Sequence, residues 1–415
     1  MTTTAIHLAF EADAASFAET IAPALEREGW SPRRASAEHR SPDQSSALAQ
    51  AISETRVVLA LISPASAASE AMRREIEAAW NNGKPVIPVI VGDVAPDAPI
   101  MSGLSAERID LRVEPLSRVL EAVRAELAGG VVIAMLNIKG GVGKTILAAN
   151  LFAAAHLIDG RSVSFIDLDP QHNLTQYFLP AGERNQLRAN GATIYAALGD
   201  DGSLQGVVER ATPLNRARRR AQTRFDLVSG DERLFEYTLD TRSEADKAQA
   251  FARFRELVAQ LRRRSDAVVI DANPCATFLT RLAITAADHI VAPVRPETYS
   301  LTGLNMLEHV VRAVRGRPLR PSEFSVLLNG VNDRTRTDGN GDPDALTLAE
   351  ISQAPFFGSA LLEEAVPYSG ALRATPTDRY APNPINVTAI MRVGGRQVKE
   401  SLARAAAAIL RRAQR

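Results

Sequence analysis

Seven consecutive residues, KGGVGKT from Lys139 to Thr145, have the composition of an anion-binding loop. Glycines let backbone N–H groups approach a phosphate closely, and a helix that follows such a loop adds the positive end of its dipole. Lys144 and Thr145 are of the types that touch terminal phosphates and ligate Mg²⁺. The usual spacing is broken, because Ile138 stands where the first glycine of G-x-x-x-x-G-K-[ST] belongs. Glycine-rich turns also occur without a ligand, but the G-K-T triplet favours nucleotide binding.

Acidic residues stand at the ends of two apolar runs further along the chain. Asp271 follows AVVI directly, and Asp167 and Asp169 follow VSFI. A carboxylate at the carboxyl end of a buried parallel strand is more often functional than structural. Carboxylate oxygens are also ligands that Mg²⁺ accepts. The sequence therefore favours a functional carboxylate at the end of each run.

A further group of charged residues lies in SEAMRREIEAA, near the start of the chain. A carboxylate in this segment could stabilise the oxocarbenium character that develops when a glycosidic bond breaks. The alternative is a solvated helix, on which Glu70, Glu75 and Glu77 lie with Arg73 and Arg74 and have no chemical role.

Alternating strands and helices position these residues. In the first part, apolar runs at Ile6–Phe10, Val57–Ser63 and Pro85–Val91 predict buried strands. Helical spacing occurs between and after them at Ala14–Glu28, Asp43–Thr55, Ser69–Asn81 and Pro115–Leu127. The second part has further predicted strands at Val131–Leu136, Val163–Asp167, Phe225–Ser229, Ala267–Asp271, His289–Val294 and Phe324–Asn329. Both parts therefore predict an α/β fold with parallel strands, a flavodoxin-like sheet followed by a larger doubly wound sheet.

Composition limits the class of protein. A chain of 415 residues predicts two or three domains, and 46% hydrophobic with 23% charged residues is ordinary for a folded protein. No run approaches the ~20 apolar residues of a membrane span, and MTTTAIHLAF lacks the basic start of a secretory signal. A single cysteine, Cys275, allows no internal disulfide and is expected to be a small buried residue. We expect a cytoplasmic protein.

The boundary between the two parts is expected at Gly129–Gly130, because a glycine pair suits the end of a helix. Residues 1–128 then form the first domain and residues 131–415 the second. The first domain should attach at the amino edge of the second sheet, away from the phosphate loop. The net charge of zero divides into −6 up to Ala128 and +6 after it. Polar segments at Leu214–Arg224 and Asn332–Asp344 are expected to be exposed.

Four motifs in one order give the second part a family resemblance. KGGVGKT, FIDLDPQHNLT at 165–175, VVIDANP at 268–274 and APVRPE at 292–297 resemble the ParA/MinD ATPases, whose phosphate loop has a deviant Walker A sequence. The resemblance extends from about Val131 to Ile385. It implies that ATP and Mg²⁺ are bound and that two ATP-loaded copies form a homodimer. The phosphate contacts it implies are Gly140, Gly141, Val142, Gly143, Lys144, Thr145 and Ile146.

The resemblance also implies individual roles. Lys139 resembles the signature lysine that reaches across the dimer to the partner's phosphates, where its charge acts as an arginine finger does. Asp169 resembles the residue that positions the attacking water. Asp271 resembles the Walker B carboxylate that orients water on Mg²⁺, and Asp167 is assigned a place close to the metal. Residues implied to line the base pocket are Asn329, Pro296 and Glu297.

This sequence departs from the family pattern at three positions. Ile146 replaces a hydroxyl residue, His172 replaces a glycine after D-P-Q, and Asn273 replaces a proline after Walker B. None of these changes removes a catalytic group. They affect the expected hydrolysis rate and the motion of the loop that senses the γ-phosphate more than the binding of ATP.

The first part resembles the Toll/interleukin receptor (TIR) fold from about Ile6 to Leu127. The match is best at VVLALISPASAASEAMRREIEAA, where a strand ends in serine and is followed by a turn and a helix with a glutamate. By that motif Glu75 aligns with the catalytic glutamate of TIR enzymes that cleave NAD. The resemblance therefore implies NAD as a substrate, and the alternative is a non-enzymatic interaction or self-association domain.

The end of the chain predicts a basic helix within Ile390–Arg415. Seven basic residues accompany one acidic residue there, and they could touch DNA phosphates without reading sequence. The alternative, which we favour, is a packed amphipathic helix with its arginines in water. Its expected inward residues are Val398, Leu402, Ala405 and Ile409, and its basic residues are Arg392, Arg396, Lys399, Arg404, Arg411, Arg412 and Arg415.

Two hypotheses for the whole chain follow. In the first, an ATP-dependent dimerisation switch controls a TIR effector that degrades NAD, as in defence against phage. In the second, the ATPase positions DNA or cargo, as ParA-like proteins do, and the TIR-like domain is a scaffold for a partner protein. The sequence identifies neither the activating signal nor the partner.

Overall fold

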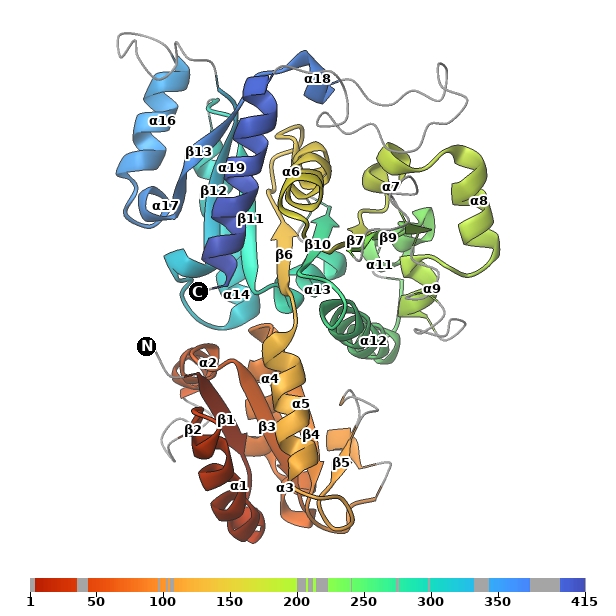
Figure 1. The fold of residues 1–415 in the computed structure, drawn as a ribbon, viewed down its shortest axis with the longest axis vertical. Helices are drawn as coiled ribbons and strands as arrows, with labels where there is room; N and C mark the ends of the chain where they lie inside the picture. The colour runs from red at the N-terminus through yellow and green to blue at the C-terminus, as the bar shows by residue number, and fades with distance from the viewer. Residues whose placement is uncertain are drawn as a thin grey trace.

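The computed structural model contains two β-sheets built mainly from parallel strands. The sheets lie one above the other along the longest axis of the molecule (Figure 1). The structure describes residues 4–35, 44–95, 98–101, 104, 108–199, 207, 212–213, 223–239, 241–273, 275, 277–297, 299–331, 343–373 and 396–414. The polar segment predicted at 214–224 lies largely outside this range, as do 332–342, Arg392 and Arg415. No helix in the described part of the chain combines the length and apolar character that crossing a bilayer requires.

The first sheet has five parallel strands in the order β2-β1-β3-β4-β5. These are β1 (Ala5–Ala9), β2 (Ser31–Arg33), β3 (Val57–Ile62), β4 (Val86–Ile90) and β5 (Ile109–Asp110). The helices are α1 (Ala15–Arg27), α2 (Ser45–Ser53), α3 (Pro64–Ala68), α4 (Glu70–Asn81) and α5 (Ser117–Ala128). α1 and α5 cover one face, and α2 and α4 cover the other. This strand order is flavodoxin-like, so the predicted fold class is confirmed, although β2, β5 and α3 were not predicted.

The second sheet has eight strands in the order β13-β12-β11-β6-β10-β7-β9-β8, and only β8 pairs antiparallel. They are β6 (Val131–Met135), β7 (Val163–Leu168), β8 (Thr212–Pro213), β9 (Phe225–Val228), β10 (Ala267–Ala272), β11 (His289–Val294), β12 (Phe324–Val331) and β13 (Leu361–Pro367). The predicted doubly wound sheet is confirmed. The two edge strands, β8 and β13, were not predicted.

Helices cover both faces of this sheet (Figure 1). α12 (Glu244–Arg262), α13 (Phe278–Ala286) and α14 (Ser300–Arg315) bury apolar side chains on one face, and α6 (Lys144–Asp159) and α19 (Arg396–Ala413) do so on the other. The remaining helices are α7 (Asn173–Phe178), α8 (Ala181–Ala189), α9 (Ile194–Leu198), α11 (Phe235–Thr238), α16 (Pro343–Gln353), α17 (Pro355–Ala360) and α18 (Gly370–Arg373).

The C-terminal helix α19 packs against the sheet, as the amphipathic alternative predicted. Leu402, Ala405 and Ile409 are fully buried. Arg412 donates hydrogen bonds to the carbonyls of Ala360 and Leu361 at 2.7 and 3.0 Å, which ties the last turn of the helix to the start of β13. The helix is therefore part of the core.

Gly129 and Gly130 join the two sheets between the end of α5 and the start of β6. A side chain at Gly130 would meet the Ser265 carbonyl oxygen at 1.9 Å, so this close approach of two backbones requires glycine. The first domain lies at the amino ends of the second sheet, opposite the loop that follows β6, as the sequence predicted (Figure 1).

Candidate functional site

Contacts of two asparagine side chains fix the backbone of the loop between β6 and α6. Asn137 donates to the Pro293 carbonyl at 2.8 Å and accepts from the Lys139 N–H at 2.9 Å. Gly143 has φ 95°, and a side chain there would meet the Asn329 amide at 2.5 Å. Gly140 and Gly141 instead border open space, where an added Cβ meets nothing within 4 Å. This part of the loop has room for an anion.

Lys144 folds into the loop from the first residue of α6. It is 9% exposed, and its ammonium donates to the carbonyls of Asn137 at 3.1 Å and Lys139 at 3.4 Å. Burial lowers its pKa, while the negative charges of Asp271 and Asp169 oppose that shift. The amine is therefore placed among backbone oxygens and carboxylates at the position where a phosphate would sit.

Three carboxylates converge beside Lys144 from adjacent strands. Asp271 pairs in register with Asp167 across β10 and β7. Asp167 accepts from the Thr175 N–H at 2.7 Å and hydroxyl at 2.6 Å, and burial raises its pKa to about 7. Asp169, 7% exposed, accepts from the Gln171 N–H at 2.9 Å, and burial raises its pKa as well.

Asp271 differs from its neighbours because no donor among the described residues lies within hydrogen-bonding geometry of its carboxylate oxygens. It is 1% exposed, and neither oxygen is bonded within the described residues. Burial raises its pKa well above the usual range, and the charge of Asp167 adds to the shift, whereas the nearby Thr145 hydroxyl and Lys144 ammonium oppose it. An unsatisfied buried carboxylate is costly, so it points to a cation or water that completes the site.

The donor set fits magnesium bound together with a nucleotide. The described residues contain no group of three His, Cys, Asp or Glu side chains that could hold a metal on its own. Mg²⁺ usually takes one or two protein ligands, with phosphate oxygens and water completing its coordination. Thr145 and Asp271 could supply those protein contacts, and Asp167 is already occupied by Thr175.

Lys139 points toward the surface and not into the loop. Its ammonium pairs with the Glu297 carboxylate at 3.0 Å, and the two side chains are 30% and 49% exposed. An exposed pair of this kind contributes only about 0.2–1 kcal/mol, so it breaks easily. The structure therefore places Glu297 beside Lys139, with Pro296 buried next to it.

Asn329 reaches the phosphate loop itself. It donates to the Val142 carbonyl at 2.8 Å, so its side chain supports the loop backbone in this structure. Ile146, one of the three departures, packs against the apolar cluster under α6.

The other two departures adopt conformations that their positions explain. His172 has φ 41°, in the left-handed region that favours glycine, which accounts for the glycine expected there. Asn273 accepts from the Cys275 N–H at 2.8 Å. Cys275 is exposed, so the prediction that it is buried was wrong. It lies beyond the last buried residue of β10, where the chain leaves the sheet.

In the first domain, Glu75 is buried, and the prediction that its helix face is solvated was wrong for this residue. It is 1% exposed and its carboxylate lies 2.7 Å from Nε2 of His7. Met72, Glu75, Ile76 and Ala79 form the inward stripe of α4, with i, i+3, i+4 and i+7 spacing. The charges on the outer side of α4 hid this stripe in the sequence.

Two acidic side chains at the carboxyl end of β1 hold the turn that leads to α4. Asp13 accepts from the Ser63 hydroxyl at 2.7 Å and from the Ala65 N–H at 3.1 Å. Glu11 accepts from the Ser69 hydroxyl at 2.5 Å. These contacts join segments about 50 residues apart, and no local pattern predicted them.

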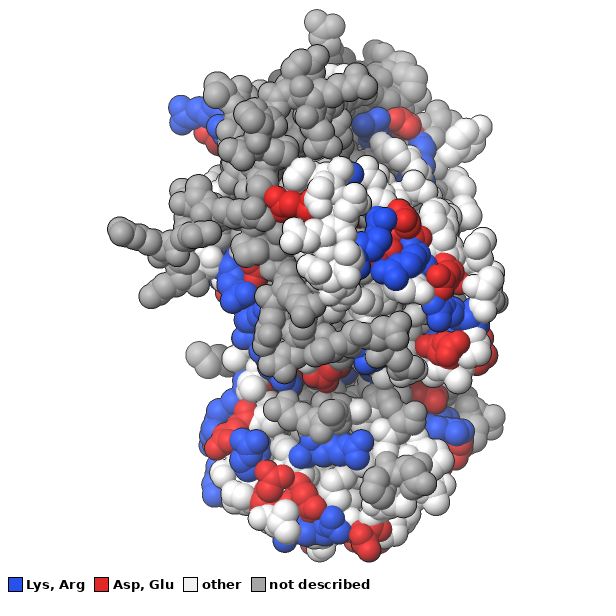
Figure 2. Space-filling view, turned by 90° about the vertical axis from the view of Figure 1, so that its right-hand side faces the viewer, with Lys and Arg blue, Asp and Glu red and all other residues white. Residues whose placement is uncertain are grey.

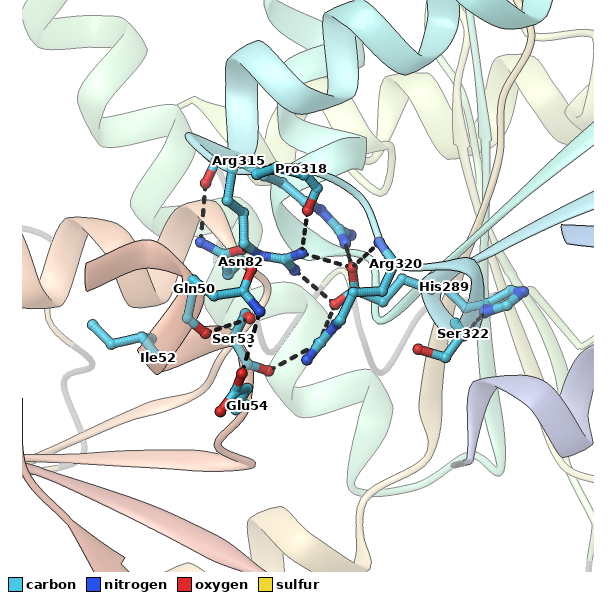
Figure 3. A network of polar contacts seen from close by, with 12 residues as sticks. Gln50, Ile52, Ser53, Glu54, Asn82, His289, Arg315, Pro318, Arg320 and Ser322 are labelled. Carbon is cyan, nitrogen blue, oxygen red and sulfur yellow. Dashed lines mark hydrogen bonds and ion pairs between the residues drawn. The ribbon is translucent and has the colours of Figure 1, made fainter. Parts of the chain in front are cut away.

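A buried ionic network joins the two domains at the end of α14 (Figure 3). Arg317 pairs with Glu323 at 2.6 Å and donates to the Asn82 side chain at 2.6 Å, and Asn82 donates to the Arg315 carbonyl at 3.2 Å. Arg320 also pairs with Glu323 and donates to the Ser53 carbonyl at 3.1 Å. These cations hold the pKa of Glu323 well below its usual range despite its burial.

Helix α14 connects this network to the phosphate loop. In its first turn, Gly303 faces Asn137 and Lys139, whose side chains would lie 3.7 and 3.8 Å from an added Cβ. Its last residue, Arg315, lies in the network that contacts the first domain. A single helix thus touches both regions.

Comparison with known proteins gives two family matches. Residues 130–322 match a family model described as an AAA domain, and residues 6–123 match one described as a TIR domain. Sporulation initiation inhibitor protein Soj of Bacillus subtilis is 31% identical over 248 residues, which cover 60% of this chain and 88% of Soj. Chromosome partitioning protein ParA of Caulobacter vibrioides is 30% identical over 248 residues, 56% of this chain and 86% of ParA. A plasmid partition protein from Borrelia burgdorferi superposes with a TM-score of 0.44 at 20% identity, covering 58% and 91% of the two chains.

Proposed function

Because this chain belongs to the ParA family of ATPases and carries a TIR domain ahead of the ATPase domain, we propose that it is an ATP-dependent dimerisation switch acting on that TIR domain. The observation that carries the proposal is the unpartnered carboxylate of Asp271 beside an open glycine loop. A site with a buried carboxylate, a buried lysine and unfilled space around Gly140 suits a phosphate chain accompanied by a cation.

Each residue of the loop then has a task. Lys144 exchanges its backbone carbonyl partners for phosphate oxygens, and the N–H groups of the loop bind the same anion. Thr145 and Asp271 hold Mg²⁺, which shields the charge of the phosphates when bound. Asp169 accepts a hydrogen bond from the attacking water and orients it toward the terminal phosphate.

Dimerisation gives Lys139 its role. When a second copy approaches, Lys139 leaves Glu297 and reaches toward the partner's phosphates, at the cost of one weak exposed ion pair. Tyr299 at the start of α14 and Met306 within it are 77% and 53% exposed, and a second copy could cover them. Two TIR domains then come together when ATP is bound and separate after hydrolysis.

Two functions are candidates for the TIR domain. NAD cleavage in a defence role rests on the position of Glu75, which must leave His7 and become accessible before it can meet the ribose. Positioning of DNA or cargo, with the TIR domain as a scaffold, is favoured by the closed state of Glu75 and by the names of the Soj and ParA relatives. Among the described residues on the face shown in Figure 2, acidic and basic side chains are interspersed.

Light scattering with and without ATP tests the switch. The wild type should dimerise with ATP, Lys139→Ala should stay monomeric, and Asp169→Ala should dimerise without turnover. Glu297→Gln should dimerise at lower ATP concentration, because it removes the ion pair between Lys139 and Glu297. Lys399→Ala on α19 serves as the control. A normal ATP dimer of Lys139→Ala would overturn the proposal.

Incubation with NAD, with and without ATP, distinguishes the two outputs. Consumption that needs ATP and is lost in Glu75→Ala supports the NAD-cleaving effector. Absence of consumption in a preparation that forms ATP dimers favours the scaffold.

A further inference from the structure

A cavity of about 550 Å³ lies between the two domains, far from the phosphate loop. It is bordered by the end of α4, the start of β4, helix α5 and one side of α12. In Figure 1 the ends of α5 and α12 approach one another at this junction. Cavities of 300–1,000 Å³ at domain interfaces commonly hold small molecules.

Cationic groups outnumber acidic groups in the lining. Seven basic and three acidic residues border the cavity, and the acids are already engaged. Glu121 pairs with Arg118 at 2.9 Å, Glu126 pairs with Arg263 at 3.3 Å, and Glu256 accepts from Gln260 at 3.1 Å. The lining therefore has positive charge that its own acids do not neutralise.

Lys84 is a cation of this lining that lies near the junction of the two domains. Its side chain makes no hydrogen bond or ion pair with any residue the structure describes, and burial lowers its pKa to about 7. The nearby carboxylates of Asp288 and Glu323 oppose the shift. Both are bound elsewhere, because Asp288 pairs with Arg262 at 3.3 Å and Glu323 with Arg317 at 2.6 Å. An anion in the cavity would supply the counter-charge that Lys84 lacks.

The remaining wall is apolar. The Arg255 guanidinium lies 3.8 Å from the centre of the Trp80 ring, so the two form a flat stacked surface. Other apolar residues that border the cavity are Val86, Ile87, Pro88, Leu104, Val258 and Ala286. This surface suits an apolar ligand body better than a strongly hydrated ion such as free phosphate.

We propose that this cavity binds a small organic anion with an apolar body and one carboxylate or phosphate group, and that Lys84 anchors the charged group. The apolar body lies against Trp80 and the β4 side of the cavity. Because the first domain and α12 both border the cavity, the bound molecule stabilises one arrangement of the two domains. This site is separate from the nucleotide site and does not depend on ATP hydrolysis.

Fluorescence titration of the full chain with 8-anilinonaphthalene-1-sulfonate, an aromatic anion of suitable size, tests the site. The dye should bind the wild type in saturating ATP, and Lys84→Met should weaken that binding at least tenfold. Lys84→Arg should retain most of it. Lys247→Met is the matched control, because Lys247 pairs with Glu244 outside the cavity, and its affinity should be unchanged. Equal affinity in the wild type and Lys84→Met would overturn the proposal.

Protection from reductive methylation tests the wild type without any variant. The chain has five lysines, so the modification of each can be followed by peptide mass spectrometry. The dye should slow methylation of Lys84 and leave Lys247 unaffected, and an unchanged rate at Lys84 would contradict the proposal. Displacement by 1-naphthoate or by 1-naphthyl phosphate then distinguishes a carboxylate from a phosphate ligand, and displacement by neither would count against both.

Discussion

Glu75 in the first domain and Asp271 in the second are equally buried, at 1% exposure, but they differ in their partners. The Glu75 carboxylate is held by His7 at 2.7 Å, whereas neither oxygen of Asp271 has a hydrogen bond within the described residues. A satisfied buried carboxylate contributes to its own fold, and an unsatisfied one requires something else to bind. The difference is that Glu75 is held within the first domain, whereas Asp271 faces the phosphate loop without a described donor.

The largest predicted effect is the loss of ATP affinity on replacement of Lys144. Lys144→Ala removes the ammonium that faces the phosphates, and the loss of about 3 kcal/mol in charge-assisted hydrogen bonds corresponds to roughly 100-fold weaker ATP binding. Calorimetric titration with ATP and Mg²⁺ measures it. Tight binding by a folded Lys144→Ala protein would show that the loop does not hold the nucleotide.

The second prediction concerns the unsatisfied carboxylate. Asp271→Asn should abolish magnesium-dependent hydrolysis and yet stabilise the nucleotide-free protein by roughly 1 kcal/mol, because it removes an unpaired ionisable group from the interior. Urea unfolding and a phosphate-release assay measure the two effects. If the variant is less stable than the wild type without nucleotide, Asp271 has a structural partner that this interpretation overlooks.

For the buried carboxylate of the first domain, Glu75, we expect the opposite outcome, a loss of stability. His7→Ala removes the hydrogen bond that His7 makes with the buried Glu75 carboxylate, so the free energy of unfolding should fall by about 3 kcal/mol. Glu70→Ala is the control on the same helix, since its exposed pair with Arg73 should contribute less than about 0.5 kcal/mol. Urea denaturation of both variants measures these losses. An equally small loss of unfolding free energy in both would mean that the His7–Glu75 pair does not stabilise the domain.

The last prediction extends the comparison to a buried histidine whose hydrogen-bond partners are neutral. His289 lies 3.0 Å from the Ser322 carbonyl and 2.9 Å from the Ser325 hydroxyl, and burial lowers its pKa from 6.5 to about 4. Between these values the unfolded chain binds a proton that the folded chain does not, so stability should fall as pH falls from about 6.5 to about 4. In His289→Asn the free energy of unfolding should depend less steeply on pH, by at most about 1.4 kcal/mol per pH unit. Parallel slopes for the two proteins would contradict the assignment.

The sequence predicted those parts of the site that lie within short motifs. KGGVGKT and the carboxylates at strand ends are local patterns, and alternation of apolar runs was enough to predict both parallel sheets. Contacts between distant segments were not predictable in the same way. His7 and Glu75 are 68 positions apart, and Asn82 and Arg317 are 235 apart. Such pairs depend on which helix faces which strand, and a single sequence does not record that choice.

Local signals also failed where the chain leaves its regular elements. Cys275 is exposed because β10 has ended before it, although a free cysteine is usually a small buried residue. The edge strand β13 is mixed in burial and carries two adjacent glutamates, so its sequence lacks a clear alternation of apolar and polar residues. Glu75 was misassigned because the charges around it are typical of a surface helix, and only the i+3 and i+4 spacing of its apolar neighbours shows the inward side.

Helix α14 begins beside the phosphate loop and ends in the network that contacts the first domain. Its 16 residues make a rod about 24 Å long at 1.5 Å per residue. A rotation of about 5° at its first turn therefore displaces its far end by about 2 Å, a distance comparable to the difference between a hydrogen bond and no contact. A rearrangement of that size around Lys139 would therefore change how Asn82 is held.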